Sequence, residues 1–278
     1  MDLLDKLDKV EIKTIDRFPP DDMEYCRQAE KDYHDAYNIY SEFSYLSEDV
    51  SESIGALADK LYIQKIEDSK DKVYDCNERF ISKICGYFRK KYAVTVDAPS
   101  WKITEELSYR NPKERYDAVP LKYILDSVYE QMGGMSFEEK AFLELKEDAK
   151  EALTTYHDKK SKYRIKGTKL VIDDFYASHK SHIWERYMAS VQAKHHAFFK
   201  ALTHFEYDDY YISQKYNFLC DYQLDEDKGV YDKHFISSSV IDTIKLYKNG
   251  KIEIDFKDHK TVAKFISTYF PGIPQAAA

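Results

Sequence analysis

LYKNGKIEIDF, residues 246–256, is the stretch that decides how the C-terminal part of this chain folds. Two apolar alternating runs flank Asn249-Gly250, and this dipeptide between such runs is the strongest short-range signal for a β-hairpin. The stretch therefore predicts two paired strands. What remains to be decided is the pairing register, because a shift of one residue turns every side chain to the other face.

The alternation selects the register. A two-residue loop would place Leu246 opposite Glu253, which puts an apolar and an acidic side chain on one face. A three-residue loop over 248–250 pairs Leu246 with Ile252 instead, and the same register pairs Ile244 with Ile254 and Lys245 with Glu253. It gives one apolar face and one ion-paired face, with Gly250 as the left-handed residue of a bulge. We expect the three-residue loop, which also turns Asp242 away from Asp255.

A helix is expected directly after the hairpin. Asp258 is its predicted N-cap, and Pro271-Gly272 ends it. Its apolar residues are Val262, Phe265, Ile266 and Tyr269. Because they share one face, this helix should cover the apolar face of the hairpin.

The N-terminal part of the chain has a helical pattern instead. Asp21 after two prolines marks a helix start. Apolar residues then recur at alternating spacings of three and four: Cys26, Ala29, Tyr33, Ala36, Tyr40 and Phe43. A second helix is expected after Ser51, with an interruption at the polar stretch 64–72. Two antiparallel helices packed along these seams are the predicted structure of 21–92.

Between these parts, the sequence predicts further helices and one strand pair. A helix over 121–132 ends at Gly133-Gly134, and Ser136 caps the next, which runs to about Tyr156. A basic strand-like stretch turns near Gly167, and a helix is expected over 181–205. The fold class is thus α+β, mainly α. Three regions are expected: an acidic coiled-coil-like region 1–92, a helical middle 93–157 with a proline-containing connector, and an α+β unit 158–278.

The charge of the chain is concentrated at one end. The net charge is −8, while residues 1–60 hold 16 acidic and 7 basic side chains, which is −9. This disfavours nonspecific DNA binding by the N-terminal region. The four cysteines form no CxxC pair, so a reducing, cytoplasmic setting without disulfides is expected.

One pattern suggests catalysis. Asp242, followed by Asp255 and Lys257, resembles the acidic-acidic-lysine pattern of Mg²⁺-dependent nucleases. The preferred hairpin register argues against this reading, because it separates Asp242 from the other two. No phosphate-binding glycine loop and no serine- or cysteine-hydrolase pattern occurs.

Histidine gathers in one region of the sequence, at His179, His182, His195, His196 and His204. No third metal ligand lies at a suitable spacing, and His195 falls on an apolar stripe, so it is expected in the core. The sequence predicts neither a metal site nor a cofactor.

Two other stretches are candidates for binding. A basic stretch could hold a phosphate backbone, or its lysines could merely protect an edge strand. It comprises Lys159, Lys160, Lys162, Tyr163, Arg164, Lys166 and Lys169. A tyrosine-acid segment suits a protein-binding surface, although tyrosine can equally replace phenylalanine in a core. It comprises Tyr207, Asp208, Asp209, Tyr210, Tyr211, Tyr216 and Tyr222.

The hairpin and final helix, LYKNGKIEIDF and VAKFISTYFPGIP, resemble the C-terminal part of an uncharacterised bacterial domain family, and IKGTKLVIDD is similar to a second segment of it. Members occur on plasmids, conjugative elements and phages, sometimes attached to adenine-specific DNA methyltransferases. The resemblance implies a mobile-element setting and no activity, since the Asn-Pro-Pro-aromatic motif of those methyltransferases is missing here.

These observations favour a non-catalytic binding protein. The expected partner is a host protein or nucleoprotein complex, such as a nucleic-acid-targeting enzyme or defence complex, which the protein would inhibit. The alternative is a nucleic-acid-binding or nuclease accessory protein that uses the basic stretch. No membrane partner is expected, and a homodimer through the N-terminal helices stays open.

Overall fold

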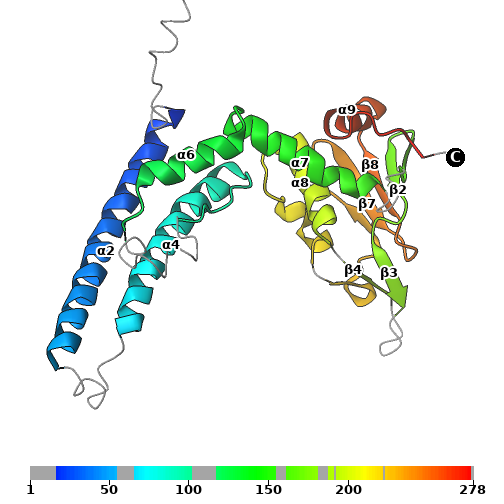
Figure 1. Cartoon of the computed structure of the whole chain (residues 1–278). Helices are drawn as coiled ribbons and strands as arrows, with labels where there is room; N and C mark the ends of the chain where they lie inside the picture. Colours follow the sequence, from blue (N-terminus) through cyan, green and yellow to red (C-terminus); the bar gives the residue numbers. More distant parts are fainter. Residues whose placement is uncertain are drawn as a thin grey trace, which may run out of the picture. The chain divides into compact units, whose positions relative to one another are not determined.

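The computed structural model describes residues 17–54, 66–101, 117–154, 161–180, 187–190, 192–221 and 223–276. The chain divides into two compact units, Met1–Phe137 and Glu138–Ala278. The first contains long helices, whereas the second combines helices with antiparallel strands (Figure 1). The expected α+β class with a helical majority is confirmed.

The first unit is built on a helical hairpin. Helices α2 (Pro20–Ile54) and α4 (Ile66–Tyr92) pack along each other, and α6 (Leu121–Met132) contacts both. The expected helix over 121–132 is therefore confirmed, and Gly133 ends it in the left-handed conformation at φ 61°. Helix α2 continues to Ile54, so the expectation that a second helix starts after Ser51 is wrong.

The polar stretch 64–72 does not break α4 where the structure describes it. The helix is continuous from Ile66 through Lys72, contrary to the predicted interruption. Charged side chains are compatible with a helix because they leave the backbone hydrogen bonds intact.

The seam between α2 and α4 is buried along its first half. Cys26, Ala29 and Tyr33 are each no more than 5% exposed. The Tyr33 ring stacks on Phe80 at 4.3 Å, and its hydroxyl donates a 2.6 Å hydrogen bond to Asn77 Oδ1. The same hydroxyl accepts from the backbone N–H of residue 119 at 2.7 Å. Tyr33 thus joins both helices to the chain that leads into α6.

The second unit contains a five-stranded antiparallel sheet in the order β1-β2-β8-β7-β6. The strands are β1 (Tyr163–Lys166), β2 (Lys169–Ile172), β6 (Lys233–Phe235), β7 (Ile241–Leu246) and β8 (Ile252–Phe256). Helices α7 (Phe137–Leu153), α8 (Ala193–Tyr207) and α9 (His259–Tyr269) contribute to one hydrophobic core with the apolar face of this sheet. The α9 helix lies close to the sheet in Figure 1.

The register of the β7–β8 hairpin is the expected one. Leu246 pairs with Ile252, Ile244 with Ile254, and Lys245 with Glu253, so the loop has three residues. Gly250 adopts φ 82°, as the bulge requires.

The final helix is also confirmed in detail. The side chain of Asp258 accepts a hydrogen bond from the backbone N–H of Thr261, which identifies Asp258 as the N-cap. The four expected apolar residues of α9 are all buried, from Val262 to Tyr269. Together, the hairpin and α9 form the small α+β arrangement that the sequence predicts.

The expected helix over 181–205 is wrong in its first half. A second sheet forms there from β3 (Ala177–Lys180), β4 (Tyr187–Ser190) and β5 (Gln223–Asp225). Helix α8 begins only at Ala193, after Gln192. Two short 3₁₀ helices, Gln214–Leu219 and Glu226–Lys228, complete the unit.

Candidate functional site

A groove opens where the second half of the α2–α4 seam leaves the core. It has a volume of about 640 Å³ and is lined by residues of α2 between Ala29 and Phe43 and of α4 between Lys72 and Lys83. The seam spacing continues through Ala36, Tyr40 and Phe43, yet these positions are not buried as those of the first half are. The expectation of a seam packed along its whole length is therefore wrong for this half.

Large apolar side chains are exposed on α2 at the groove, where Ile39 and Phe43 line it, and Leu46 follows them on the same helix. Ile39 is 67% exposed, Phe43 58% and Leu46 56%, and their spacing of four and three places them on one helix face. Contiguous apolar surface on a helix face is typical of a protein-binding site rather than of a solvated face. We call Ile39, Tyr40, Phe43 and Leu46 the open seam.

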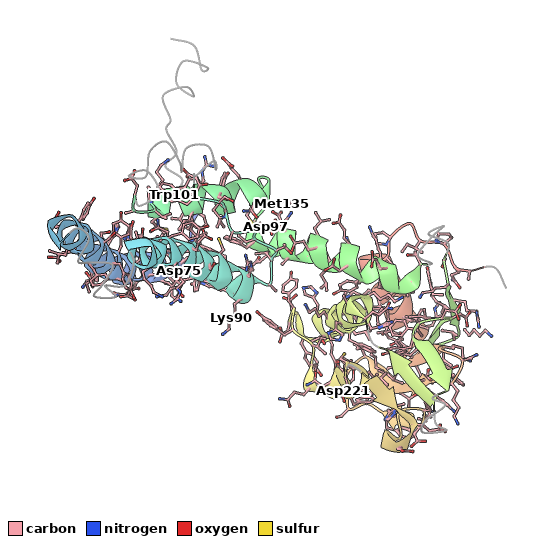
Figure 2. The ribbon with its side chains drawn as sticks, turned by 60° about the horizontal axis from the view of Figure 1, so that its bottom comes forward. Asp75, Lys90, Asp97, Trp101, Met135 and Asp221 are labelled. Atoms are coloured by element: carbon pink, nitrogen blue, oxygen red, sulfur yellow. The ribbon has the colours of Figure 1, made fainter. Side chains whose placement is uncertain are left out.

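The charges on the two rims of the groove differ in sign. The α2 rim carries Asp32, whereas the α4 rim carries three basic side chains and one acidic one: Lys72, Asp75, Arg79 and Lys83. Asp75 is labelled on α4 in Figure 2. An ion pair crosses the groove between Lys83 and Asp32 at 3.4 Å. A ligand that lies in the groove would thus meet an acidic side and a mainly basic side.

A buried carboxylate lies where α2 begins and α4 ends, and its hydrogen-bond partners come from α4. The side chain of Asp22 is fully buried and accepts hydrogen bonds from Tyr87 at 2.8 Å, from Tyr92 at 2.6 Å and from Lys91. The hydrogen bond to Asp22 raises the pKa of Lys91 above its usual range. Three donors on one carboxylate indicate a structural role, which fixes the start of α2 against the end of α4.

The tyrosine-acid segment divides between core and surface. Tyr216 is fully buried, so it cannot belong to a protein-binding surface, while Tyr207 and Tyr211 are 47% and 52% exposed. Tyr210 donates to the backbone oxygen of Glu138 at 3.3 Å. Tyr222 lies outside the described residues.

The acidic members of that segment serve local structure. Asp208 is the left-handed C-cap of α8, and Asp209 accepts a 2.9 Å hydrogen bond from the backbone N–H of Tyr211. Beside them, Glu206 accepts from Tyr207 at 2.6 Å and from the backbone N–H of Ser239 at 2.7 Å. Burial alone would raise the pKa of Glu206, but these hydrogen bonds lower it below its usual value.

Most of the basic stretch is engaged within the chain. Lys162 is buried, donates to the backbone oxygen of Asp174 at 2.9 Å, and burial lowers its pKa to about 8. Tyr163 is buried as well, and its hydroxyl donates to the backbone oxygen of residue 273 at 2.8 Å. Lys162 and Tyr163 therefore cannot contact a phosphate backbone.

The other members of the basic stretch lie in different environments. Arg164 forms an ion pair with Asp173, and Lys169 one with Glu253 at 2.6 Å. Lys166 is exposed. Lys159 and Lys160 lie outside the described residues.

The nuclease-like residues do not assemble a metal site. Thr168 donates a 2.6 Å hydrogen bond to Asp255, while Lys257 lies 3.4 Å from Asp242 in an ion pair. A bulge between Ile241 and Thr243 makes Asp242 an extra residue and lets it reach Lys257. The expectation that Asp242 is separated from both partners is thus wrong for Lys257. Within the described residues, no three His, Cys, Asp or Glu side chains gather in a way that could hold a metal ion.

The histidines occupy separate environments. His195 is fully buried, as expected, and accepts from the backbone N–H of Gln192 while its other ring nitrogen contacts the backbone oxygen of Phe175. Burial lowers its pKa to about 3. His196 bonds the backbone oxygen of Cys220, and His204 bonds the Tyr269 hydroxyl. His179 lies on β3 rather than on a helix, and His182 lies outside the described residues.

Comparisons with protein-family models, curated proteins and solved structures give no match for this chain. Within the residues that the structure describes, no helix combines the length and the apolar character needed to cross a bilayer.

Sequence reasoning missed the open seam because its spacing is that of a buried seam. Periodicity indicates that Phe43 and Tyr40 share a face with Tyr33, but it does not indicate where the partner helix stops covering that face. The signal that could have located the opening is composition: the part of α4 with exposed Lys72 and Asp75 offers few large apolar side chains to pack against.

Proposed function

We propose that this protein is a non-catalytic binding factor that takes an amphipathic helix of a partner protein into the groove between α2 and α4. The observation that carries the proposal is the open seam, where Ile39 and Phe43 remain more than half exposed beside a groove of about 640 Å³. A helix in an apolar groove is a common mode of protein recognition, with anchors at spacings of three and four.

The rims of the groove favour one charge pattern on that partner helix. Asp32 on α2 favours basic side chains on one flank, and Lys72, Arg79 and Lys83 on α4 favour acidic side chains on the other. The partner helix should therefore carry an apolar stripe between flanks of opposite charge.

The resemblance of the C-terminal part to proteins of mobile elements bears on the identity of the partner. It supports a host nucleic-acid enzyme or defence complex in the cytoplasm as the target, and inhibition as the outcome. Binding by the tyrosine-acid segment has less support, because Tyr216 is buried and the acidic residues there hold local structure.

Affinity capture from a bacterial lysate with three forms of the full chain tests this function. The wild type is compared with Phe43→Glu in the groove and with Tyr45→Glu, which changes a 65% exposed side chain on another face of the same helix. The proposal is supported if a protein is captured by the wild type and by Tyr45→Glu but not by Phe43→Glu, and if that protein, once purified, again binds the wild-type chain. Equal capture by all three forms contradicts it.

Self-association is a separate outcome of the same design. If a second copy fills the groove, light scattering after size exclusion will give a dimer that becomes a monomer with Phe43→Glu. That result would replace the proposed binding of a different protein by the formation of a homodimer through the groove.

A further inference from the structure

The sheet of the second unit has a second face, which points away from the core. The strand register places directly opposed residues on one face. One row across all five strands reads Lys166, Lys169, Asp255, Thr243 and Phe235. The neighbouring row reads Arg164, Val171, Glu253, Lys245 and Lys233. We call these ten residues the outer face.

The outer face is basic although the chain is acidic. Its ten residues include five basic and two acidic side chains, which is 5 − 2 = +3, against −8 for the whole chain. The ion pairs of Lys169 with Glu253 and of Arg164 with Asp173 offset positive charge on β1 and β2, so Lys233 and Lys245 on β6 and β7 carry much of what remains. There Lys233 and Lys245 contact aromatic rings.

Two aromatic rings stand among these lysines. Phe235 is 81% exposed, and Lys233 Nζ lies 5.5 Å from its ring centroid. Tyr247 continues the alternation of β7, and its hydroxyl donates to Glu253 of the outer face at 3.4 Å. Lys245 and Lys251 lie 5.1 and 3.7 Å from the centroid of the Tyr247 ring.

Packing does not account for the position of Phe235. The main hydrophobic core takes its strand residues from the opposite face, including Leu170, Ile244 and Ile254. On the outer face only Val171 and Thr243 are buried among its ten residues, whereas Phe235 is not. An aromatic ring left in solvent forgoes the stabilisation that burial gives to the core aromatic residues of this unit, such as Phe198 and Phe265. Flat rings interleaved with lysines on an open surface are instead the features that bind unpaired bases and their phosphates.

We propose that the outer face binds single-stranded nucleic acid. Phe235 and Tyr247 stack on bases, and Lys233, Lys245 and Lys251 hold the phosphates between them. The ligand is single-stranded because a base within a duplex does not offer its face to a protein ring. This site lies in the second unit and does not depend on the groove of the first.

The outer face also gives the basic stretch a different role from the expected one. Lys162 and Tyr163 are buried and do not take part, whereas Arg164, Lys166 and Lys169 occupy the β1–β2 end of this face. Arg164 and Lys169 are ion-paired with Asp173 and Glu253, so Lys166 is the member of the stretch that adds net positive charge at this end. The sequence could not show this, because the other residues of the proposed site come from β6, β7 and the loop that follows β7, about seventy residues downstream by the numbering.

Fluorescence anisotropy with labelled single-stranded DNA and RNA of twelve nucleotides, a duplex of equal length and a polyglutamate peptide tests the proposal on the full chain. We expect binding of the single strands that weakens with salt, at about −0.7 in log K against log salt for each phosphate contact. Phe235→Ala should weaken it roughly 5- to 100-fold. Lys245→Ala should reduce the salt slope by about 0.7.

Matched controls separate this site from general charge and from misfolding. Tyr211→Ala removes another exposed ring, and Lys122→Ala another exposed lysine, on elements outside the sheet, so both should bind like the wild type. Because Phe235 is outside the core, Phe235→Ala should keep the wild-type melting temperature. Absence of single-strand binding, equal binding by Phe235→Ala, or equal binding of polyglutamate would each overturn the proposal.

Discussion

The backbone N–H of Tyr176 donates a 3.0 Å hydrogen bond to the carbonyl oxygen of Gly250, which ties the loop of the 246–256 hairpin to the chain that follows β2. The contact requires a glycine for two reasons. Gly250 adopts φ 82°, and a Cβ atom there would overlap the backbone oxygen of Tyr176. The loop of the hairpin thus packs closely against the backbone at Tyr176.

Gly250→Ala should therefore destabilise the protein by at least about 1–3 kcal/mol, the usual cost of a strained backbone conformation. Urea unfolding measures it. Gly167→Ala is the matched control for backbone strain alone, because Gly167 also has a positive φ, 61°, but has open space around its Cβ position. Gly250→Ala should cost more than this control, because it adds the overlap with the Tyr176 oxygen. The account of the loop fails if both variants lose the same stability.

The two halves of the α2–α4 seam should respond differently to truncation. Phe80→Ala removes a ring that is 3% exposed and stacked on Tyr33, so we expect a loss of about 3–5 kcal/mol. Phe43→Ala removes a ring that is 58% exposed, and its stability should change by about 0.5 kcal/mol or less. Thermal unfolding monitored by circular dichroism tests this. A large loss for Phe43→Ala would show that the seam is packed there.

Asp22 should be essential for the stability of the first unit. Asp22→Ala leaves Lys91 and two tyrosine hydroxyls without their shared acceptor, and the expected loss is about 3 kcal/mol. Asp21→Ala, at an exposed neighbouring position, should cost less than about 1 kcal/mol. Chemical denaturation of both variants compares them, and similar losses would refute a special role for the buried carboxylate.

His195 should make stability depend on pH on the acidic side. Its pKa is lowered by burial to about 3 in the folded chain, so the unfolded chain binds a proton first as the pH falls. Between about pH 6 and pH 3, this group should lower the free energy of unfolding by about 1.4 kcal/mol per pH unit.

A comparison with His195→Gln isolates that contribution from the carboxylates. The stability difference between wild type and variant should shrink as the pH falls, because only the wild type carries the proton linkage. Denaturant unfolding at several pH values provides the curves. Parallel curves would mean that His195 is not the titrating group.

The sequence was sufficient where local patterns and tertiary packing agree. The alternation around Asn249-Gly250 has only one register that keeps Leu246 and Ile244 among apolar partners, and that register forms. Asp258 and the apolar face of α9 were likewise readable, because caps and helical spacing act over a few residues.

Prediction failed where long-range packing decides. The stretch 181–192 has helical spacing, yet β4 forms there because β3 and β5 pair with it. The basic stretch contained no sign that Lys162 would be buried, since burial depends on distant segments. Phe235 was not predicted as a binding residue, because a single phenylalanine does not produce a periodic pattern in the sequence.

Photo-crosslinking in bacterial cells tests the protein-binding function most directly. A photoreactive residue replaces Ile39 in the open seam or, as a control, Tyr45 on another face of α2. We predict that position 39 forms a crosslink to an amphipathic helical segment of another protein, and that Phe43→Glu abolishes it. Equal crosslinks from both positions, crosslinks only to a second copy of this chain, or none from position 39 would contradict the proposed function.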